Sequence, residues 1–291
     1  MTALRVGWVG LGAMGGPMAR VAVAAGFEVT AFDVDANAVA ALAEAGCRIA
    51  DSPEEAARKA DVLVLMVATP AQAEAVLFGE GGAASALRPG AIVLVMATVG
   101  DIAVRSWAER LADAGVAVVD APVSGGVARA AAGELLIMAA GTGADLARVS
   151  PLLDALAASA PIVGSASGDG QRMKLVNQLL CGVHIVAAAE ALSFAEALGL
   201  DQRAAWEVVR SGAAGSFMLD DRGRRMLDED PPVRSAVDIF VKDMGLVVEA
   251  AEAAGHEPSL ARAARAVYEA AHDRGLGRSD DSAVIQTYRM P

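Results

Sequence analysis

A lysine and a carboxamide stand three residues apart directly after a glycine-rich turn. They are Lys174 and Asn177, and the turn spans residues 164–170. Residues i and i+3 are neighbours on one face of an α-helix, so both side chains would project to the same side. A lysine that is partly removed from water has a lowered pKa and can take up a proton near neutral pH. We therefore predict that Lys174 transfers a proton, although an isolated lysine near a helix start is more often a solvated surface residue.

The segment that carries these two residues is predicted to be one helix from Gln171 to Leu198. Nearly all of its faces are apolar, and a helix of this kind is buried in a large protein. We therefore expect Lys174, at the start of this helix, to be partly desolvated. Only helical patterns follow, so residues 165–291 are predicted to form an all-α helical-bundle domain.

A second glycine-rich turn lies near the start of the chain, between a strand pattern and a helical pattern. A further strand pattern follows and ends in Asp33. Strand, glycine turn, helix and acid-ended strand within about thirty residues form the fingerprint of a dinucleotide-binding unit, in which the helix N-terminus faces the phosphates. The alternative is a glycine turn of structural use only. The cofactor-binding residues predicted in this turn are Gly10, Leu11, Gly12, Ala13, Met14 and Gly15.

Asp33 decides which dinucleotide we expect. A carboxylate at the end of the second strand accepts hydrogen bonds from the ribose 2'-hydroxyl of the adenosine and would repel a 2'-phosphate. Residues 34–37 contain no arginine that could receive that phosphate. We therefore predict NAD rather than NADP as the cofactor.

Strand and helix patterns alternate over the whole N-terminal half. This alternation predicts an α/β domain over residues 1–164 with a Rossmann doubly wound, mostly parallel sheet, and residues 134–140 are predicted to be one of its strands. Ligands of such sheets bind beyond the carboxyl ends of the strands. Two residues at those ends, Val67 and Thr98, are predicted on the cofactor side, although Thr98 could equally cap a helix.

A third loop of this kind spans residues 120–126 and reads Asp-Ala-Pro-Val-Ser-Gly-Gly. The hydroxyl of Ser124 and the amides of Gly125 and Gly126 stand close together there and could cradle a carboxylate. The alternative is an ordinary turn. Further along, Lys242 and Asp243 form a charged pair inside an apolar helix pattern, where they could either lie on the surface or point into a cleft.

Composition excludes several classes of protein. The chain has 36 acidic and 24 basic residues and a net charge of −12, which argues against nucleic-acid binding and against binding to an anionic membrane. No stretch reaches about 18 uninterrupted apolar residues, so no membrane span is predicted. The two cysteines, Cys47 and Cys181, and the three isolated histidines predict neither a metal site nor a disulfide framework. A reducing cytoplasm fits this composition.

Four motifs, taken together, resemble the signature of the β-hydroxyacid dehydrogenases, among them the 3-hydroxyisobutyrate and 6-phosphogluconate dehydrogenases. The motifs are Gly10-x-Gly12-x-Met14-Gly15-x-Pro17-Met18-Ala19, Asp120 to Gly126, Gly168-x-Gly170-x-x-x-Lys174-x-x-Asn177, and Lys242-Asp243. They occur in the family's order and spacing over nearly the whole chain.

The resemblance implies an enzyme that oxidises a small hydroxy acid with NAD. It implies Lys174 as the catalytic acid/base and Asn177 as its partner on the substrate. Homodimers or homotetramers formed through the helical domain are also implied. The implied substrate-binding residues are Ser124, Gly125, Gly126, Lys174, Asn177 and Gln178, and the implied contacts on the cofactor side include Thr98 and Lys242.

Residues 176–185, 235–243 and 280–285 further resemble the L-threonate dehydrogenases of this family, which oxidise a four-carbon sugar acid at C2. The chain departs from that subgroup at residues 215–217, where Gly-Ser-Phe replaces Asn-Ser-Trp. A 3-hydroxyisobutyrate dehydrogenase and a reductase of glyoxylate or succinic semialdehyde stay open as alternatives. An imine reductase and a non-catalytic NAD-binding sensor are disfavoured because Lys174 is present.

Overall fold

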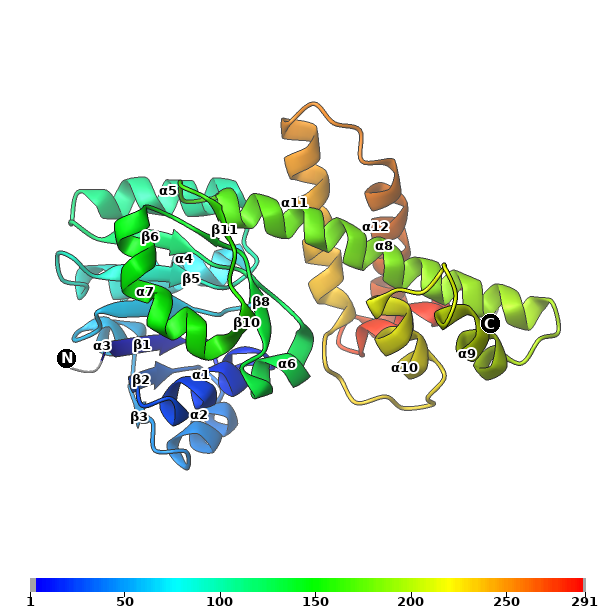
Figure 1. Cartoon of the computed structure of the whole chain (residues 1–291), viewed down its shortest axis with the longest axis horizontal. Coiled ribbons are helices and arrows are strands. Elements are labelled where there is room, and N and C mark those ends of the chain that lie inside the picture. The colour runs from blue at the N-terminus through cyan, green and yellow to red at the C-terminus, as the bar shows by residue number, and fades with distance from the viewer. Residues whose placement is uncertain (1–3, 290–291) are drawn as a thin grey trace. The chain divides into compact units, whose positions relative to one another are not determined.

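The computed structural model describes residues 4–289, which form two compact units (Figure 1). The first unit extends to Lys174 and the second follows it, so the division falls inside the long helix α8 (Asp169–Ala197). The predicted limits of the two functional domains, 1–164 for NAD binding and 165–291 for substrate binding, stay a prediction.

The first unit is built on an eight-stranded sheet with the order β11-β9-β6-β5-β4-β1-β2-β3. All neighbouring strands are parallel except β6 and β9. The order from β3 to β6 is that of a Rossmann sheet, with the reversal between β1 and β4, and confirms the predicted mostly parallel, doubly wound fold. The strands are β1 (Arg5–Val9), β2 (Glu28–Phe32), β3 (Arg48–Ile49), β4 (Val62–Leu65), β5 (Ile92–Val95), β6 (Ala117–Asp120), β9 (Ala139–Ala140) and β11 (Ile162–Gly164).

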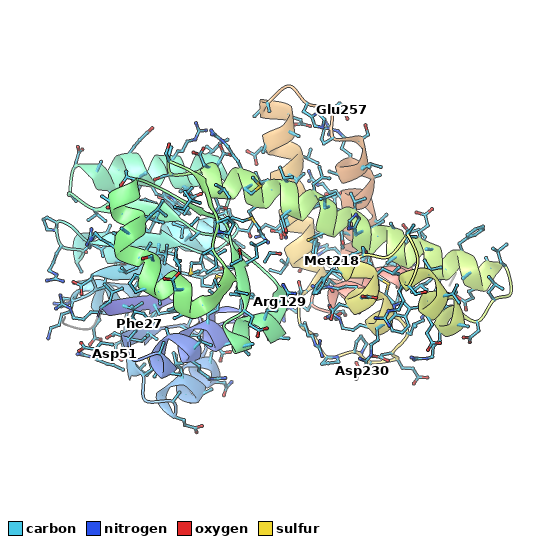
Figure 2. The ribbon with its side chains drawn as sticks, viewed as in Figure 1. Phe27, Asp51, Arg129, Met218, Asp230 and Glu257 are labelled. Atoms are coloured by element: carbon cyan, nitrogen blue, oxygen red, sulfur yellow. The ribbon has the colours of Figure 1, made fainter. Side chains whose placement is uncertain are left out.

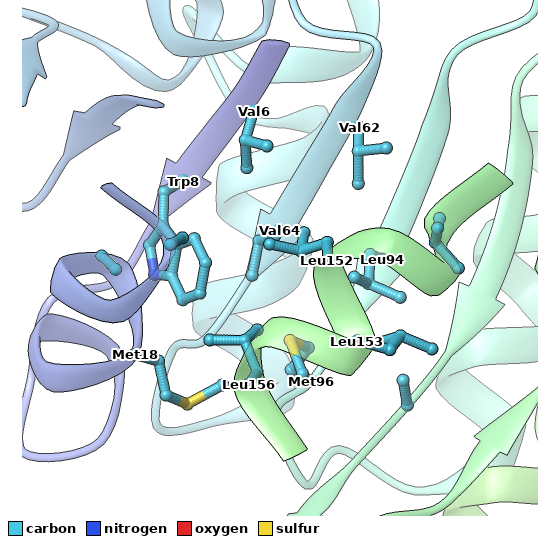
Figure 3. Packing of buried hydrophobic residues seen from close by; sticks show 14 of the residues in the cluster. Val6, Trp8, Met18, Val62, Val64, Leu94, Met96, Leu152, Leu153 and Leu156 are labelled. Atoms are coloured by element: carbon cyan, nitrogen blue, oxygen red, sulfur yellow. The ribbon is translucent and has the colours of Figure 1, made fainter. Parts of the chain in front are cut away.

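Helices cover both faces of this sheet, which is why its central strands are apolar throughout. On one face Trp8 and Val64 of the sheet pack with Met18 and Leu152 (Figure 3), and on the other face Val93 packs with helices of the opposite layer. The first layer contains α1 (Gly15–Ala24), α2 (Ala36–Ala43), α6 (Gly126–Ala132) and α7 (Gly143–Leu156). The second contains α3 (Pro53–Ala57), α4 (Pro70–Phe78), the 3₁₀ turn η1 (Ala83–Ser85) and α5 (Asp101–Ala112).

The prediction of a single strand over residues 134–140 is wrong. The chain changes partners at Met138, whose N–H donates to the carbonyl of Pro122 at 3.0 Å, whereas the next N–H, of Ala139, donates to the carbonyl of Pro161 at 3.0 Å. The segment is therefore divided between two sheets. One half is β9, and the other is β8 (Leu135–Ile137), which lies between β7 (Val123–Ser124) and β10 (Ala157–Ser159) in a three-stranded sheet.

The second unit is built from helices, which confirms the predicted all-α class. Helices α11 (Val237–Ala253) and α12 (Ser259–Ala271) are antiparallel, and the connection between them carries Glu257 (Figure 2). The rings of Phe240 on α11 and Tyr268 on α12 stack with their centroids 5.2 Å apart. Besides the rest of α8, the elements are α9 (Gln202–Arg210), the π-helical turn η2 (Leu219–Gly223), α10 (Arg224–Met226), α11 (Val237–Ala253), α12 (Ser259–Ala271), the π-helical turn η3 (His272–Leu276) and the 3₁₀ segment η4 (Asp281–Thr287).

A buried network of charges joins the irregular segments of this unit. Arg222 donates to Asp281 at 3.1 Å, and Arg225 pairs with both Asp280 and Asp281. All four side chains are buried, so each charge depends on its partners for compensation. The network fixes η2 against η4, and no sequence pattern predicted it.

The prediction that α8 is buried on all sides is wrong for one face. Val176, Leu180 and Phe194 are 60%, 50% and 62% exposed, because the partners that pack on α8 in this chain cover only its other faces. By length and composition alone α8 could also cross a membrane. This is weak evidence, since a core helix of a soluble protein passes the same test.

Candidate active site

The glycines of the turn after β1 differ in whether the surrounding protein leaves room for a side chain. Gly10 has a φ of +99°, and a Cβ there would lie 2.4 Å from the carbonyl oxygen of Met66. A Cβ on Gly15 would lie 2.0 Å from the carbonyl oxygen of Gly10. A Cβ on Gly12 would meet nothing within 4 Å, so the protein itself does not require glycine there. The open position fits a pyrophosphate that approaches the backbone closely.

The remaining residues of the turn differ in what they can offer to a dinucleotide. Leu11 is buried in the core, and its N–H donates to Asp33 Oδ2 at 2.5 Å. Neither its side chain nor that N–H is therefore available to a ligand. Ala13 is exposed, and Met14 packs half-buried on the core. The half-buried carboxylate of Asp33 stands at the end of β2, beside the turn, which fits a ribose.

The loop after β5, which contains Thr98, is held by a buried side chain from α8. Gln171 donates through Nε2 to the carbonyl of Ala97 at 3.0 Å, and its Oε1 accepts from the N–H groups of Val99 and Gly100 at 3.0 and 3.2 Å. Gly100 occupies the N-cap position of helix α5, so Thr98 lies two residues before the cap. In the loop after β4, Val67 is half-buried and packs against the core.

A buried carboxylate at the end of β6 holds the start of α8. Asp120 accepts from the N–H of Gly168 at 3.0 Å and from that of Gln171 at 2.8 Å. A Cβ on Gly170 would lie 2.6 Å from the carbonyl oxygen of Met138 and 2.8 Å from Asp120 Oδ2, so only glycine allows this approach.

Asp120 and Gln171 together fasten the first turn of α8 to the carboxyl ends of β5 and β6. Lys174 follows one turn later and is only 6% exposed, as predicted for a desolvated lysine. Sequence reasoning included both segments but assigned no role to Asp120 or Gln171. Periodicity carries no signal for a buried polar side chain whose partners are backbone groups.

The predicted carboxylate cradle lies where β7 passes into α6. Ser124 ends β7, and Gly125 and Gly126 have φ values of +138° and +75°. A Cβ on Gly125 would also come within 2.9 Å of the side chain of Arg129. All three cradle residues are half-buried, so the hydroxyl and the amides sit in a turn that requires glycine.

Three predicted site residues in the second unit are joined by a fourth. Asn177 Nδ2 donates to Gln178 Oε1 at 2.8 Å, and Gln178 Nε2 donates to the carboxylate of Asp243. The ammonium of Lys242 lies 2.7 Å from Asp243 Oδ1. Asp243 is 2% exposed, so the alternative that this charged pair lies on the surface is contradicted.

Lys242 also lines an open hollow of about 520 Å³ between α11 and α12. Acidic groups surround the lysine there, and the imidazole of His272 lies 2.6 Å from Asp238. Among the residues 4–289, no group of histidine, cysteine or acidic side chains could hold a metal ion. The lining residues of the hollow are Asp238, Val241, Lys242, Glu269, His272 and Asp273.

Comparisons with known proteins cover both halves of the chain. Residues 5–164 match the model of the NAD binding domain of 6-phosphogluconate dehydrogenase, and residues 168–288 match that of the NAD-binding region of NADP-dependent 3-hydroxyisobutyrate dehydrogenase. An L-threonate dehydrogenase of Escherichia coli K12 is 41% identical over 97% of this chain and 94% of its own length. A 2-(hydroxymethyl)glutarate dehydrogenase of Eubacterium barkeri is 31% identical over 99% of this chain and 95% of its own length.

A solved structure gives the same result in three dimensions. The crystal structure of a 3-hydroxyisobutyrate dehydrogenase from Salmonella typhimurium superimposes with a TM-score of 0.91 at 40% identity. The similarity covers 97% of this chain and 99% of that chain. Both the Rossmann sheet and the helical unit are therefore shared with a dehydrogenase.

The pKa of Asp120 provides a test of how α8 is held. Burial raises this pKa from 3.8 to about 6, against the two N–H groups that lower it. Between about pH 4 and pH 6 the native protein thus binds this proton more tightly than the unfolded chain does. Protonation of Asp120 stabilises the fold at about pH 4, and this contribution falls as the pH rises to about 6. We expect the difference in unfolding free energy between wild type and Asp120→Asn to decrease over that range.

Urea unfolding at constant ionic strength measures this difference. The matched control is Asp51→Asn, which changes an exposed carboxylate of the same unit and should show no such pH dependence. A difference between wild type and Asp120→Asn that stays constant from about pH 4 to 7 would contradict the raised pKa.

Proposed function

Because the chain belongs to the β-hydroxyacid dehydrogenase family and is an NAD-dependent oxidoreductase, we propose that it oxidises L-threonate at C2. The product would be the corresponding 2-oxo acid, and a closely related four-carbon sugar acid is the nearest variant of this proposal. The observation that carries it is the 41% identity to an L-threonate dehydrogenase over nearly the full length of both chains. The lysine and the carboxamide on one face of α8 fit this chemistry.

Lys174 acts as the proton acceptor in this mechanism. Lys174 is 6% exposed, and in its neutral form its amine can take the proton of the C2 hydroxyl. A bound NAD would supply the acceptor for the hydride of C2, and loss of that hydride together with the hydroxyl proton would leave a carbonyl carbon at C2. Asn177 projects from the same face of α8 one turn later and orients the substrate next to Lys174. The hydrogen bonds of Asp120 and Gln171, which fasten the first turn of α8, fix the position of Lys174.

The carboxylate of the substrate is held by the turn after β7. Ser124 donates its hydroxyl hydrogen, and the N–H groups of Gly125 and Gly126 lie next to it in sequence. A carboxylate accepts such hydrogen bonds strongly, so this turn fixes the end of the substrate beyond the reacting carbon. Gln178 is buried, and both ends of its amide already have partners. It therefore acts on the substrate through Asn177.

The cofactor is held by the glycine turn and by the loops at the carboxyl ends of the strands. Gly12 leaves room for the pyrophosphate, and Asp33 binds the adenosine ribose. We assign Val67 and Thr98 to the same side of the site, from the loops after β4 and β5. Lys242 is the contact to the cofactor from the second unit.

A 3-hydroxyisobutyrate dehydrogenase is the second candidate. It is favoured by the solved structure of that description, which is 40% identical to this chain. Reduction of glyoxylate or succinic semialdehyde is less well supported, because no basic residue follows Asp33 to receive the phosphate of NADP. A non-catalytic sensor would not need a buried lysine at the start of α8.

We assign the protein to the cytoplasm. Neither Cys47 nor Cys181 forms a disulfide, and the relatives named above are dehydrogenases. Free thiols persist in a reducing compartment.

A second copy of the chain is the proposed partner of the exposed face of α8. The apolar residues on this face are three, four or fourteen residues apart, spacings that bring side chains onto one stripe of a helix. Monomeric proteins rarely expose apolar patches of this kind, so a homodimer or homotetramer through the helical unit is proposed. The exposed residues of the stripe are Met173, Val176, Leu180, Phe194 and, directly after the end of α8, Leu198.

The reaction is tested by following NAD reduction with L-threonate, D-threonate, both erythronates, 3-hydroxyisobutyrate, glycerate and 3-hydroxypropionate. We expect the highest kcat/KM with L-threonate. Lys174→Ala should lower kcat by about 10² to 10⁴-fold, since it removes the proton acceptor. A variant that retains more than about a tenth of the wild-type kcat would show that Lys174 is not that group, whichever substrate is preferred.

Cofactor choice is tested with Asp33→Ala. The substitution removes both the acceptor for the ribose hydroxyl and the charge that repels a phosphate, so the ratio of kcat/KM with NAD to that with NADP should fall at least about tenfold. Asp51→Ala, which removes an exposed carboxylate of the same unit, should leave the ratio unchanged. Equal use of both cofactors by the wild type would overturn the assignment of NAD.

The oligomer is tested by sedimentation. We expect a multiple of the 29.4 kDa chain for the wild type and a shift toward the monomer for Leu180→Asp, because a charge in a buried interface is destabilising. Leu260→Asp changes a leucine on α12 that is even more exposed than Leu180 and lies outside the stripe, so it should leave the oligomer intact. A monomeric wild type would contradict the proposal.

A further inference from the structure

Four polar side chains of the second unit form a continuous row that ends at the substrate-binding carboxamide. Lys242 pairs with Asp243 at 2.7 Å, Asp243 accepts from Gln178, and Gln178 accepts from Asn177 at 2.8 Å. The angles of the Lys242–Asp243 pair do not make a hydrogen bond, so charge attraction holds it. The middle of the row is buried, with Gln178 at 7% and Asp243 at 2% exposure.

The carboxylate gives this row a direction. An ionised carboxylate only accepts hydrogen bonds, so Gln178 must turn its NH₂ group toward Asp243 and its Oε1 toward Asn177. Asn177 must then turn its own NH₂ group toward Gln178. The second hydrogen bond of Asn177, to Cys181 Sγ at 3.3 Å, uses the same NH₂ group. A reversed Asn177 would bring its carbonyl oxygen against the carbonyl oxygen of Gln178, which is repulsive.

The direction of the row determines which atom of Asn177 is presented to a ligand. Both NH₂ hydrogens have partners within the second unit, so the carbonyl oxygen Oδ1 is the atom that faces a substrate. This oxygen is an acceptor and binds only a donor. The reacting hydroxyl has a single proton, which goes to Lys174, and an ionised carboxylate has none. The donors left for Asn177 are the amine hydrogens of Lys174, on the same face of α8, and a second hydroxyl group of the substrate. Of these, only the hydroxyl is brought by the ligand.

We propose that Asp243, acting through Gln178, fixes the carboxamide of Asn177 so that it accepts a hydrogen bond from a second hydroxyl beside the reacting one. Asp243 and Gln178 are positioning residues, and Asn177 selects for polyhydroxy acids over acids with one hydroxyl. This inference rests on the proposed function, in which Lys174 takes the proton of the reacting hydroxyl. It adds the feature of the substrate that the second unit recognises.

The test compares two substrates that differ only in the additional hydroxyls. The ratio of kcat/KM for L-threonate to that for 2-hydroxybutanoate of the same C2 configuration measures selection for the extra hydroxyls. In Asp243→Asn, Gln178 is no longer forced to donate and the row loses its fixed direction. We expect the ratio to fall at least about fivefold, mainly because kcat/KM for L-threonate decreases. If another four-carbon sugar acid is the better substrate, its own 2-hydroxy analogue takes the place of 2-hydroxybutanoate.

A double variant separates direction from structural damage. In Asp243→Asn with Gln178→Glu, the carboxylate moves one place along the row. Asn177 is again forced to donate its NH₂ group and to present Oδ1, so the ratio should recover toward the wild-type value. Glu249→Gln makes the same carboxylate-to-amide change at an exposed position of α11 and should leave the ratio unchanged. A double variant that recovers nothing would overturn the inference.

Two further results keep the outcomes distinct. If Asp243→Asn does not fold, as judged by its melting temperature, Gln178→Ala interrupts the row while it keeps the Lys242–Asp243 pair, and the same fall in the ratio is expected. An unchanged ratio in a folded variant overturns the role of Asp243. Failure of the wild type to oxidise any polyhydroxy acid would overturn both the proposed function and this inference, and would appear before any variant is made.

Discussion

The site depends on how the start of α8 is fastened to the sheet. Two buried polar side chains perform this task, Asp120 at the end of β6 and Gln171 in the first turn of α8. Their partners are backbone groups, so they hold the loops at the carboxyl edge without contributing reactive atoms. Buried polar groups are costly without partners, and satisfying them ties two strand ends and one helix start into a single arrangement.

Much of this architecture could be predicted because its signals are local. A strand, a glycine turn and an acid-ended strand follow one another around Gly10 and Asp33. Only glycine fits the backbone conformation of such a turn, so the residue types alone predict it. The mostly parallel sheet then follows from the alternation of strands and helices. The buried strands were equally clear, since both faces of a doubly wound sheet are covered.

The features that could not be predicted arise from distant partners. Residues 134–140 look like one strand, and only the positions of Pro122 and Pro161 show that the chain changes sheets at Met138. The roles of Asp120 and Gln171 depend on backbone groups about 50 and 70 residues away in sequence. The exposed face of α8 was missed for a related reason, because an apolar helix pattern does not show whether its partner lies in the same chain.

The continuity of α8 has a mechanical consequence. One unbroken helix carries Lys174 and Asn177 across the division between the two compact units. A helix rises about 1.5 Å and turns about 100° per residue, so the two residues keep a fixed offset of about 4.5 Å along the helix axis. Flexing between the units could alter many distances, but it could not separate these two groups without breaking the helix itself.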